Sequence, residues 1–238
     1  MSTSVPGGRR VGILGGTFDP IHRGHADMGL AAEQALDLTK VFVIPSSLPP
    51  HRPQTHASAF HRFAMVALVV ADRERWRASD LELRHPGTSY TADMLRKFHE
   101  RGYPPADLFF IIGADAFAEI ATWRDYPRLL DWTHFAVVSR PGHPAGALPY
   151  LLPDLSRRMV SPPFQGLEAM DPSIILIDHT TANVSSTAIR QLCAEGRTIA
   201  GLVAPGVQRH IDQHGLYAGA RRRRIDTAGA AAADTLHG

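Results

Sequence analysis

The chain has 238 residues, which is enough for one substantial domain or for one domain with additions. Apolar residues make up 44% and charged residues 20%, proportions typical of a soluble globular protein that buries a core. Part of the net charge of +2 comes from four consecutive arginines at 221–224, so the rest of the chain is close to neutral and no nucleic-acid partner is predicted.

Five short apolar runs mark the predicted strands. They are unalternated and rich in β-branched or aromatic residues, which is typical of strands buried on both faces in a parallel sheet. Each run ends in residues that start loops or cap helices. In chain order the runs cover residues 11–14, 41–44, 108–112, 135–138 and 174–177.

Helical patterns lie between and after these runs. Apolar residues recur at three- and four-residue spacing in a helix that begins near Gly24, and further helices are predicted over 61–72, 91–101 and 205–214. Residues 141–172 are rich in Pro and Gly and predict a loop with one short helix near 152–159. The alternation predicts a single α/β domain over residues 1–217, a Rossmann-like doubly wound parallel sheet.

Residues 218–238 are rich in Arg and Ala and have little to bury, so we expect a disordered tail. The alternative is a nucleic-acid-binding arm, but arginines without interleaved aromatic residues support it weakly.

The composition also bears on the compartment. The single cysteine, Cys193, allows no intrachain disulfide. The first ten residues lack the apolar stretch of a signal peptide, and no window approaches the ~20 apolar residues of a membrane span. We therefore expect a cytoplasmic protein without a membrane partner, and leave homo-oligomerisation open.

The stretch GGTFDPIHRGH, residues 15–25, directly follows the first predicted strand. Ligands of parallel sheets bind beyond the carboxyl ends of the strands. Gly15 and Gly16 let backbone N–H groups approach a ligand closely, and the helix near Gly24 directs the positive end of its dipole to the same place. These features favour an anion.

His22 and His25 allow several interpretations. Their spacing could chelate a metal, but no cysteine or carboxylate follows at the spacing of a zinc site, so we predict no metal ligand here. Two surface histidines in a turn would not explain the preceding Gly-Gly-Thr. The P-loop and dinucleotide-binding patterns are both absent. Proton transfer and binding of a phosphate both remain open from this stretch alone.

A second stretch, NVSSTAIR, follows the last apolar run at residues 183–190. Ser185, Ser186 and Thr187 are good N-cap residues, and Arg190 lies one turn into the helix, where it can bind a phosphate bidentately. Alone, this pattern is more often a capped helix than a site. Two helix N-termini that both follow strands of one sheet would meet at one crevice.

Together the two stretches resemble the nucleotidyltransferase superfamily that carries (G/T)-x-F-D-P-x-H-x-G-H and I-S-S-T-x-x-R. Within it, the chain is similar to the bacterial nicotinate-nucleotide adenylyltransferases over residues 10–217. Val184 replaces the usual Ile, and Ser46 stands where relatives often have Asn, which leaves a side-chain hydrogen bond there open. The narrower similarity rests on PPHRPQ (49–54), TSYTADML (88–95), IIGADAFAEIATWRDYPRLL (111–130), SRPGH (139–143) and LVAPGVQRHIDQHGLY (202–217).

The resemblance implies adenylyl transfer from ATP to nicotinate mononucleotide, which gives deamido-NAD and pyrophosphate in NAD biosynthesis. The attacking phosphate monoester is already ionised at neutral pH, so no general base is required. Catalysis is then positioning plus electrostatic stabilisation. Mg²⁺ is expected to arrive on the ATP phosphates, since no carboxylate cluster suggests a protein-held cage.

The resemblance also implies roles for the candidate residues that bind ATP. His22, His25 and Arg190 are the expected catalytic residues, and all three contact its phosphates. Asp115 would accept from a ribose hydroxyl, and the alternative, a helix N-cap, is compatible with that role. The remaining expected ATP-binding residues are Gly15, Gly16, Thr17, Phe18, Ser186 and Thr187.

For the mononucleotide, Trp123 is the expected platform for the pyridine ring, with a core tryptophan as the alternative. Thr91 would meet the nicotinate carboxylate. Arg52 would bind the mononucleotide phosphate, unless its Pro-rich loop is only surface. Ser46 completes the predicted substrate-binding residues.

Three other functions remain open from the sequence. Phosphopantetheine adenylyltransferases are shorter, usually have Thr at position 22 and lack the Trp stretch. Cytidylyltransferases differ in the second motif. A nucleotide-binding regulator could keep the crevice without turnover, although intact His22, His25 and Arg190 argue against it.

Overall fold

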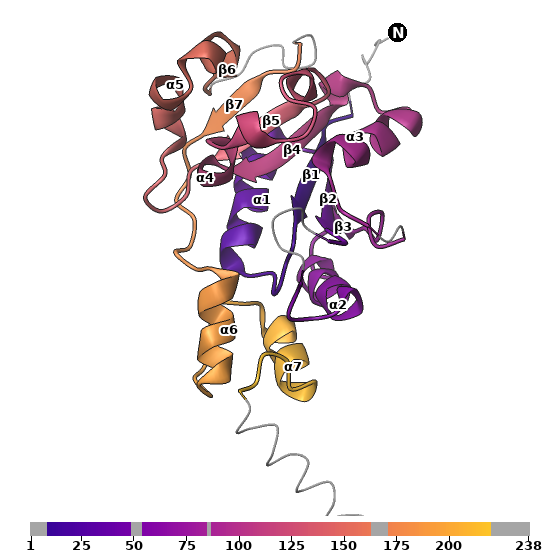
Figure 1. The fold of residues 1–238 in the computed structure, drawn as a ribbon, viewed down its shortest axis with the longest axis vertical. Coiled ribbons are helices and arrows are strands. Elements are labelled where there is room, and N and C mark those ends of the chain that lie inside the picture. Colours follow the sequence, from indigo (N-terminus) through magenta and orange to yellow (C-terminus); the bar gives the residue numbers. More distant parts are fainter. Residues whose placement is uncertain (1–8, 49–53, 85–86, 163–170, 220–238) are drawn as a thin grey trace, which may run out of the picture.

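A computed structural model of the chain describes residues 9–48, 54–84, 87–162 and 171–219. The predicted tail beyond residue 219 lies outside these ranges. Seven parallel strands form one sheet in the order β3-β2-β1-β4-β5-β7-β6, so the predicted Rossmann-like doubly wound sheet is confirmed (Figure 1). The strands are β1 (Val11–Gly16), β2 (Lys40–Pro45), β3 (Trp76–Ala78), β4 (Leu108–Gly113), β5 (His134–Val138), β6 (Met159–Val160) and β7 (Ile174–Ile177).

Helices cover both faces of this sheet. On one face pack α1 (Arg23–Leu36), α2 (Ala59–Val70), α6 (Ser186–Ala194) and α7 (Pro205–Gln213). On the other pack α3 (Thr91–Glu100), α4 (Ala114–Phe117) and α5 (Leu148–Leu151). Successive strand residues alternate between the two core clusters, as Ile13 and Leu14 do, which explains why the runs are apolar without alternation. Short 3₁₀ helices lie at Pro105–Asp107, Ile120–Thr122, Arg128–Asp131, Ala145–Ala147 and Pro153–Arg158.

Several sequence predictions need correction. β3 and β6 were not predicted, because one is three residues long with a central arginine and the other has two residues. The predicted loop over 141–172 contains α5, two 3₁₀ helices and β6 as well; its predicted short helix is the 3₁₀ helix Pro153–Arg158. The alternative in which Asp115 caps a helix is wrong, because Gly113 is the N-cap of α4.

The strand order reverses between β1 and β4, which are neighbours in the sheet although 91 residues lie between Gly16 and Leu108 in the chain. At such a switch point the loops after the two strands diverge to opposite faces and leave a crevice at the carboxyl ends. Residues 15–25 follow β1 at this edge of the sheet, and Asp115 follows β4. Within the described ranges, no helix is both long and apolar enough to cross a bilayer.

Candidate active site

A cavity of about 350 Å³ opens at the switch point, beyond β1, β2 and β4. Eight of the predicted site residues line it: Gly15, Gly16, Thr17, His25, Ser46, Thr91, Asp115 and Trp123. The structure therefore brings together residues from five separate parts of the sequence. His22, Phe18, Ser186, Thr187 and Arg190 are not in its lining, and Arg52 lies outside the described residues.

The two histidines lie against each other at the start of α1. His22 is the N-cap residue and is buried, and its ring stacks on that of His25 with 3.7 Å between centroids. The Nδ1 atom of His25 accepts a hydrogen bond from the His22 backbone N–H at 3.3 Å. A neutral imidazole that accepts through Nδ1 carries its proton on Nε2. His25 therefore keeps a second nitrogen as a donor for a ligand in the cavity.

Both imidazoles are held in the neutral form. Burial, followed by the nearby charge of Arg140, lowers the pKa of His22 to about 3. Burial, then His22 and then Arg140, lowers the pKa of His25 well below its usual value. The protonated, positively charged form of either histidine is therefore disfavoured in these surroundings. The negative charge of a bound phosphate would reduce the free-energy cost of that form. The pair is thus suited to bind phosphate oxygens.

Arg140 is a site residue that the sequence analysis did not assign. It follows β5 and lines the same cavity. Its Nη1 atom is buried and makes no hydrogen bond with any described residue, while Nη2 donates only a long bond of 3.4 Å to the Val184 carbonyl. A buried guanidinium donor without a partner is costly, so it points to an anionic ligand. Its position directly after a predicted strand was the signal that could have found it.

Phe18 is not among the residues that line the cavity, and its role in ATP binding stays a prediction. It is buried, has a left-handed backbone at φ 50°, and packs edge-on against His25 at 5.0 Å between centroids. A Cβ on Gly16 would lie 2.9 Å from the Phe18 ring, so glycine is required there for close packing. Phe18 therefore packs against the His25 ring and helps to hold it in place.

The loop that carries these residues is fastened by Asp19. Its carboxylate accepts hydrogen bonds from the backbone N–H groups of His56 (2.7 Å) and Ala57 (3.0 Å). The Tyr217 hydroxyl donates to it as well, at 2.7 Å, and burial raises the pKa of Tyr217, which keeps this donor neutral. The sequence analysis assigned no role to Asp19 or Tyr217.

Arg62, from α2, holds the segments that follow β1 and β2 at the same edge of the sheet. Only 1% of its surface is exposed. Its guanidinium donates to the carbonyls of Thr17 (2.8 Å), Ser46 (2.7 Å) and Ser47 (3.1 Å), which belong to the segments that follow β1 and β2. The Ser46 hydroxyl, buried beside the cavity, has no hydrogen-bond partner among the described residues and stays open to a substrate.

The second predicted stretch meets the first at the N-terminus of α6. Ser185 is the N-cap, and its hydroxyl accepts from the Ala188 N–H at 3.1 Å. Ser186 Oγ donates to the Pro20 carbonyl (2.9 Å) and Arg190 Nη1 to the Asp19 carbonyl (2.7 Å). Arg190 Nη2 also donates to Thr187 Oγ1 at 3.1 Å. Hydrogen bonds therefore join the start of α6 to the loop before α1, as the predicted convergence of the two stretches requires.

A second cavity of about 550 Å³ adjoins the first and shares Ser89, Thr91 and Trp123 with it. Trp123 is half-buried and stands edge-on to Phe110 at 6.0 Å between centroids. It is thus not a fully buried core tryptophan, and part of its ring faces the two cavities. This position suits a stacking platform for a flat ring.

Glu82 is a further lining residue that the sequence analysis missed. Burial raises its pKa from the usual 4.5 to about 7, against the opposing effects of a hydrogen bond with Ser89 and the charge of Lys97. The cavity therefore holds a carboxyl group that is partly protonated at neutral pH.

This shift predicts a pH-dependent stability. Between about 4.5 and 7 the folded chain binds more protons at Glu82 than the unfolded chain, so this group's contribution falls as the pH rises. Relative to wild type, the unfolding free energy of Glu82→Gln should rise by about 2–3 kcal/mol between pH 5 and pH 8. Urea unfolding at both pH values measures it. Buried histidines make the unfolding free energy rise with pH, and this effect cancels when the two proteins are compared. Equal pH dependence of the unfolding free energy in both proteins would contradict the raised pKa of Glu82.

Comparisons with known proteins place this geometry in a family. The family model described as Cytidylyltransferase-like matches residues 13–192. A "Probable nicotinate-nucleotide adenylyltransferase" of Desulfatibacillum aliphaticivorans is 39% identical over 217 residues, which cover 87% of this chain and 99% of the relative. The chain belongs to the nicotinate-nucleotide adenylyltransferase family. A relative of the same name from Desulfitobacterium hafniense (strain Y51) is 40% identical and covers 88% of this chain and 96% of its own.

Solved structures agree at the level of the fold. Plasmodium falciparum nicotinic acid mononucleotide adenylyltransferase, solved as a complex with NaAD, superposes with a TM-score of 0.63 at 17% identity and covers 88% of this chain and 97% of its own. The same protein complexed with APC gives a TM-score of 0.60. The nicotinate-nucleotide adenylyltransferase family and the observed sheet thus point to the same architecture.

Proposed function

We propose that the chain transfers the adenylyl group of ATP to nicotinate mononucleotide, giving nicotinate adenine dinucleotide and pyrophosphate in NAD biosynthesis. The observation that carries this is the cavity at the switch point, which neutral His25, Trp123 and Arg140 line together, with the Nη1 atom of Arg140 unpartnered among the described residues. The names of the relatives, at 35–40% identity over most of the chain, support the same activity.

The reaction needs no acid or base from the protein. An oxygen of the mononucleotide phosphate attacks the α-phosphorus of ATP, and the bond from that phosphorus to the oxygen bridging to the β-phosphate breaks. Negative charge moves onto the pyrophosphate. His25 and His22 would donate to oxygens around the α-phosphorus, and Arg190, Ser186 and Thr187 to the β- and γ-phosphates. Preorganised donors of this kind stabilise charge where it develops.

Two anions must also be held together before they react. Arg140 supplies the fixed positive charge for this, because burial keeps its guanidinium at the cavity wall. Gly15, Gly16 and Thr17 would approach the nucleotide with backbone groups, and Asp115 would accept from its ribose. Holding both substrates in place means that the entropy cost of bringing them together is met on binding and does not add to the barrier of the reaction.

Mg²⁺ is proposed to enter with ATP. Among the described residues, no group of three His, Cys, Asp or Glu side chains suited to hold a metal ion lies at this cavity. The ion would neutralise phosphate charge and keep several waters. A cytoplasmic location and the absence of nucleic-acid and membrane partners also remain proposals, and the number of chains in the assembly stays open.

One assay tests the proposed function: pyrophosphate release from ATP and Mg²⁺ with nicotinate mononucleotide, nicotinamide mononucleotide or phosphopantetheine offered separately. We expect the fastest release with nicotinate mononucleotide and a product with the mass of nicotinate adenine dinucleotide. Release only with phosphopantetheine would assign the chain to another adenylyltransferase. No release with any acceptor, together with retained ATP binding, would make it a regulator.

Trp123→Ala is expected to weaken binding of nicotinate mononucleotide about 5–150-fold and to leave ATP binding nearly unchanged. A lost ring stack with its buried area costs on the order of 1–3 kcal/mol. Titration calorimetry with each substrate separately measures this. Trp132→Ala is the matched control, since Trp132 also packs partly buried against the same core cluster but is outside both cavities. Equal losses for both substrates would contradict the stacking role.

A further inference from the structure

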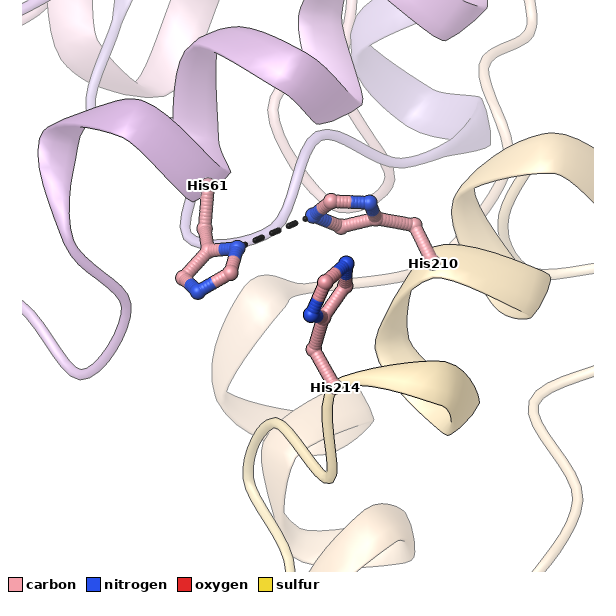
Figure 2. A group of neighbouring side chains, drawn as sticks. All are labelled: His61, His210 and His214. Atoms are coloured by element: carbon pink, nitrogen blue, oxygen red, sulfur yellow. Dashed lines mark hydrogen bonds between the residues drawn. The ribbon is translucent and has the colours of Figure 1, made fainter.

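Three histidines gather where α2 packs against α7, away from the lining of the cavity just described. His61 lies in the first turn of α2, His210 in the last turn of α7, and His214 directly after α7. Figure 2 shows the three imidazole rings turned toward one another. One ring nitrogen from each histidine lies within 4.8 Å of the other two. Nothing in the proposed reaction uses this cluster.

The spacing of the nitrogens is close to that of a metal site. His61 Nδ1 and His210 Nε2 are 3.1 Å apart. Two imidazole nitrogens on a tetrahedral zinc ion, each at 2.0–2.1 Å, are about 3.3 Å apart. His214 follows His210 by four residues, the spacing that places two side chains on one side of a helix. Small side-chain rotations would therefore bring all three onto one ion.

The surroundings of the cluster leave room for a further ligand. His61 and His210 are partly buried and His214 is exposed, which leaves one side of the cluster open to water as a fourth ligand.

We propose that His61, His210 and His214 bind a divalent transition-metal ion, foremost Zn²⁺, and that this ion fastens α7 to α2. Imidazole nitrogens suit zinc and its neighbours in the first transition row, whereas Mg²⁺ and Ca²⁺ prefer oxygen ligands. The site is therefore separate from the Mg²⁺ that accompanies ATP.

The position of the cluster indicates a stabilising role. Arg62, beside His61, holds the loops after β1 and β2, and Tyr217, three residues beyond His214, bonds to Asp19. An ion between α2 and α7 would join these two supports of the nucleotide-binding loop directly. We expect the bound ion to raise the melting temperature and to leave the turnover rate unchanged, since no reacting group contacts the cluster.

The test uses the full chain without a histidine tag, stripped with EDTA and passed into buffer. Calorimetry with ZnCl₂ should give one ion per chain. At free zinc about 100 times the Kd, Tm should rise by about 5–10 °C. MgCl₂ and CaCl₂ should give no rise. Co²⁺ in place of zinc should give the visible absorption of a four-coordinate ion.

Variants locate the ion. His210→Gln should weaken zinc binding at least about 100-fold. Loss of a residue that only hydrogen-bonds to a metal ligand can already weaken metal binding by up to about 100-fold, and His210 would be a ligand itself. His214→Gln, at an exposed position, should do the same without endangering the fold. The control His143→Gln, also exposed, should bind zinc like wild type. Absence of zinc binding in wild type, or unchanged binding in His210→Gln and His214→Gln, which would move the ion to the His22–His25 pair, would overturn the proposal.

Discussion

Replacing His25 with alanine is expected to lower kcat about 10²–10³-fold and to leave the fold intact. His25 lines the cavity, and since its Nδ1 atom accepts from the His22 N–H, Nε2 is the ring nitrogen left to donate. The hydrogen bond to the reacting phosphoryl group strengthens as charge develops, so the loss should fall on kcat more than on KM. Steady-state kinetics with ATP and nicotinate mononucleotide, together with a thermal melt, measures both quantities.

His143→Ala is the control for this variant, because His143 is exposed and its hydrogen bonds with Arg140 join backbone atoms only. Zinc and manganese should not restore the His25 variant. A near-normal kcat would contradict the phosphate-binding role. A wild-type chain that loses one tightly bound metal ion together with its activity on this substitution would instead favour the metal interpretation of the pair.

Replacing Arg62 with methionine is expected to cost about 3–5 kcal/mol of unfolding free energy. The change removes a nearly fully buried cation and leaves the carbonyls of Thr17, Ser46 and Ser47 without their donor. Hydrogen bonds to a charged group contribute about 1.5–3 kcal/mol each, and part of that is recovered where water reaches the carbonyls. For a domain of this size, Tm should fall by roughly 6–20 °C.

The matched control is Arg84→Met, since Arg84 is exposed and bonds only to Asp80 among the interactions found for it. Such a surface ion pair contributes about 0–1 kcal/mol. Chemical denaturation of the three proteins gives the comparison. If the two variants lost the same free energy, the carbonyls held by Arg62 would not be a main support of the fold.

Most of the sheet could be predicted because burial on both faces leaves an unbroken apolar run. β1, β2, β4, β5 and β7 begin and end within two residues of the predicted runs. β3 could not be found this way, because Arg77 interrupts it at the edge of the sheet, where one neighbour is missing. The order of the strands depends on how helices cross the sheet, which no local pattern encodes.

The site was predictable where its residues are adjacent in sequence. His22 and His25 lie within one turn, and local geometry sets their mutual position. Arg62 and Glu82 were missed because each depends on burial by segments far away, whereas Arg140 carried a local signal in its position after a predicted strand. The same holds for His61 and His210, which are 149 residues apart and meet only through the packing of two helices.

The bonds to Asp19 set an order of events during protein synthesis. Asp19 is held by Tyr217, 198 residues later, and its carbonyl by Arg190, 171 residues later. At about 5–20 residues per second, a ribosome needs roughly 10–40 s to pass from the first of these positions to the last. During that time the early strands can pair, but the nucleotide-binding loop lacks its fastenings. A nascent chain should therefore acquire affinity for ATP only after Tyr217 has been added and has left the ribosome.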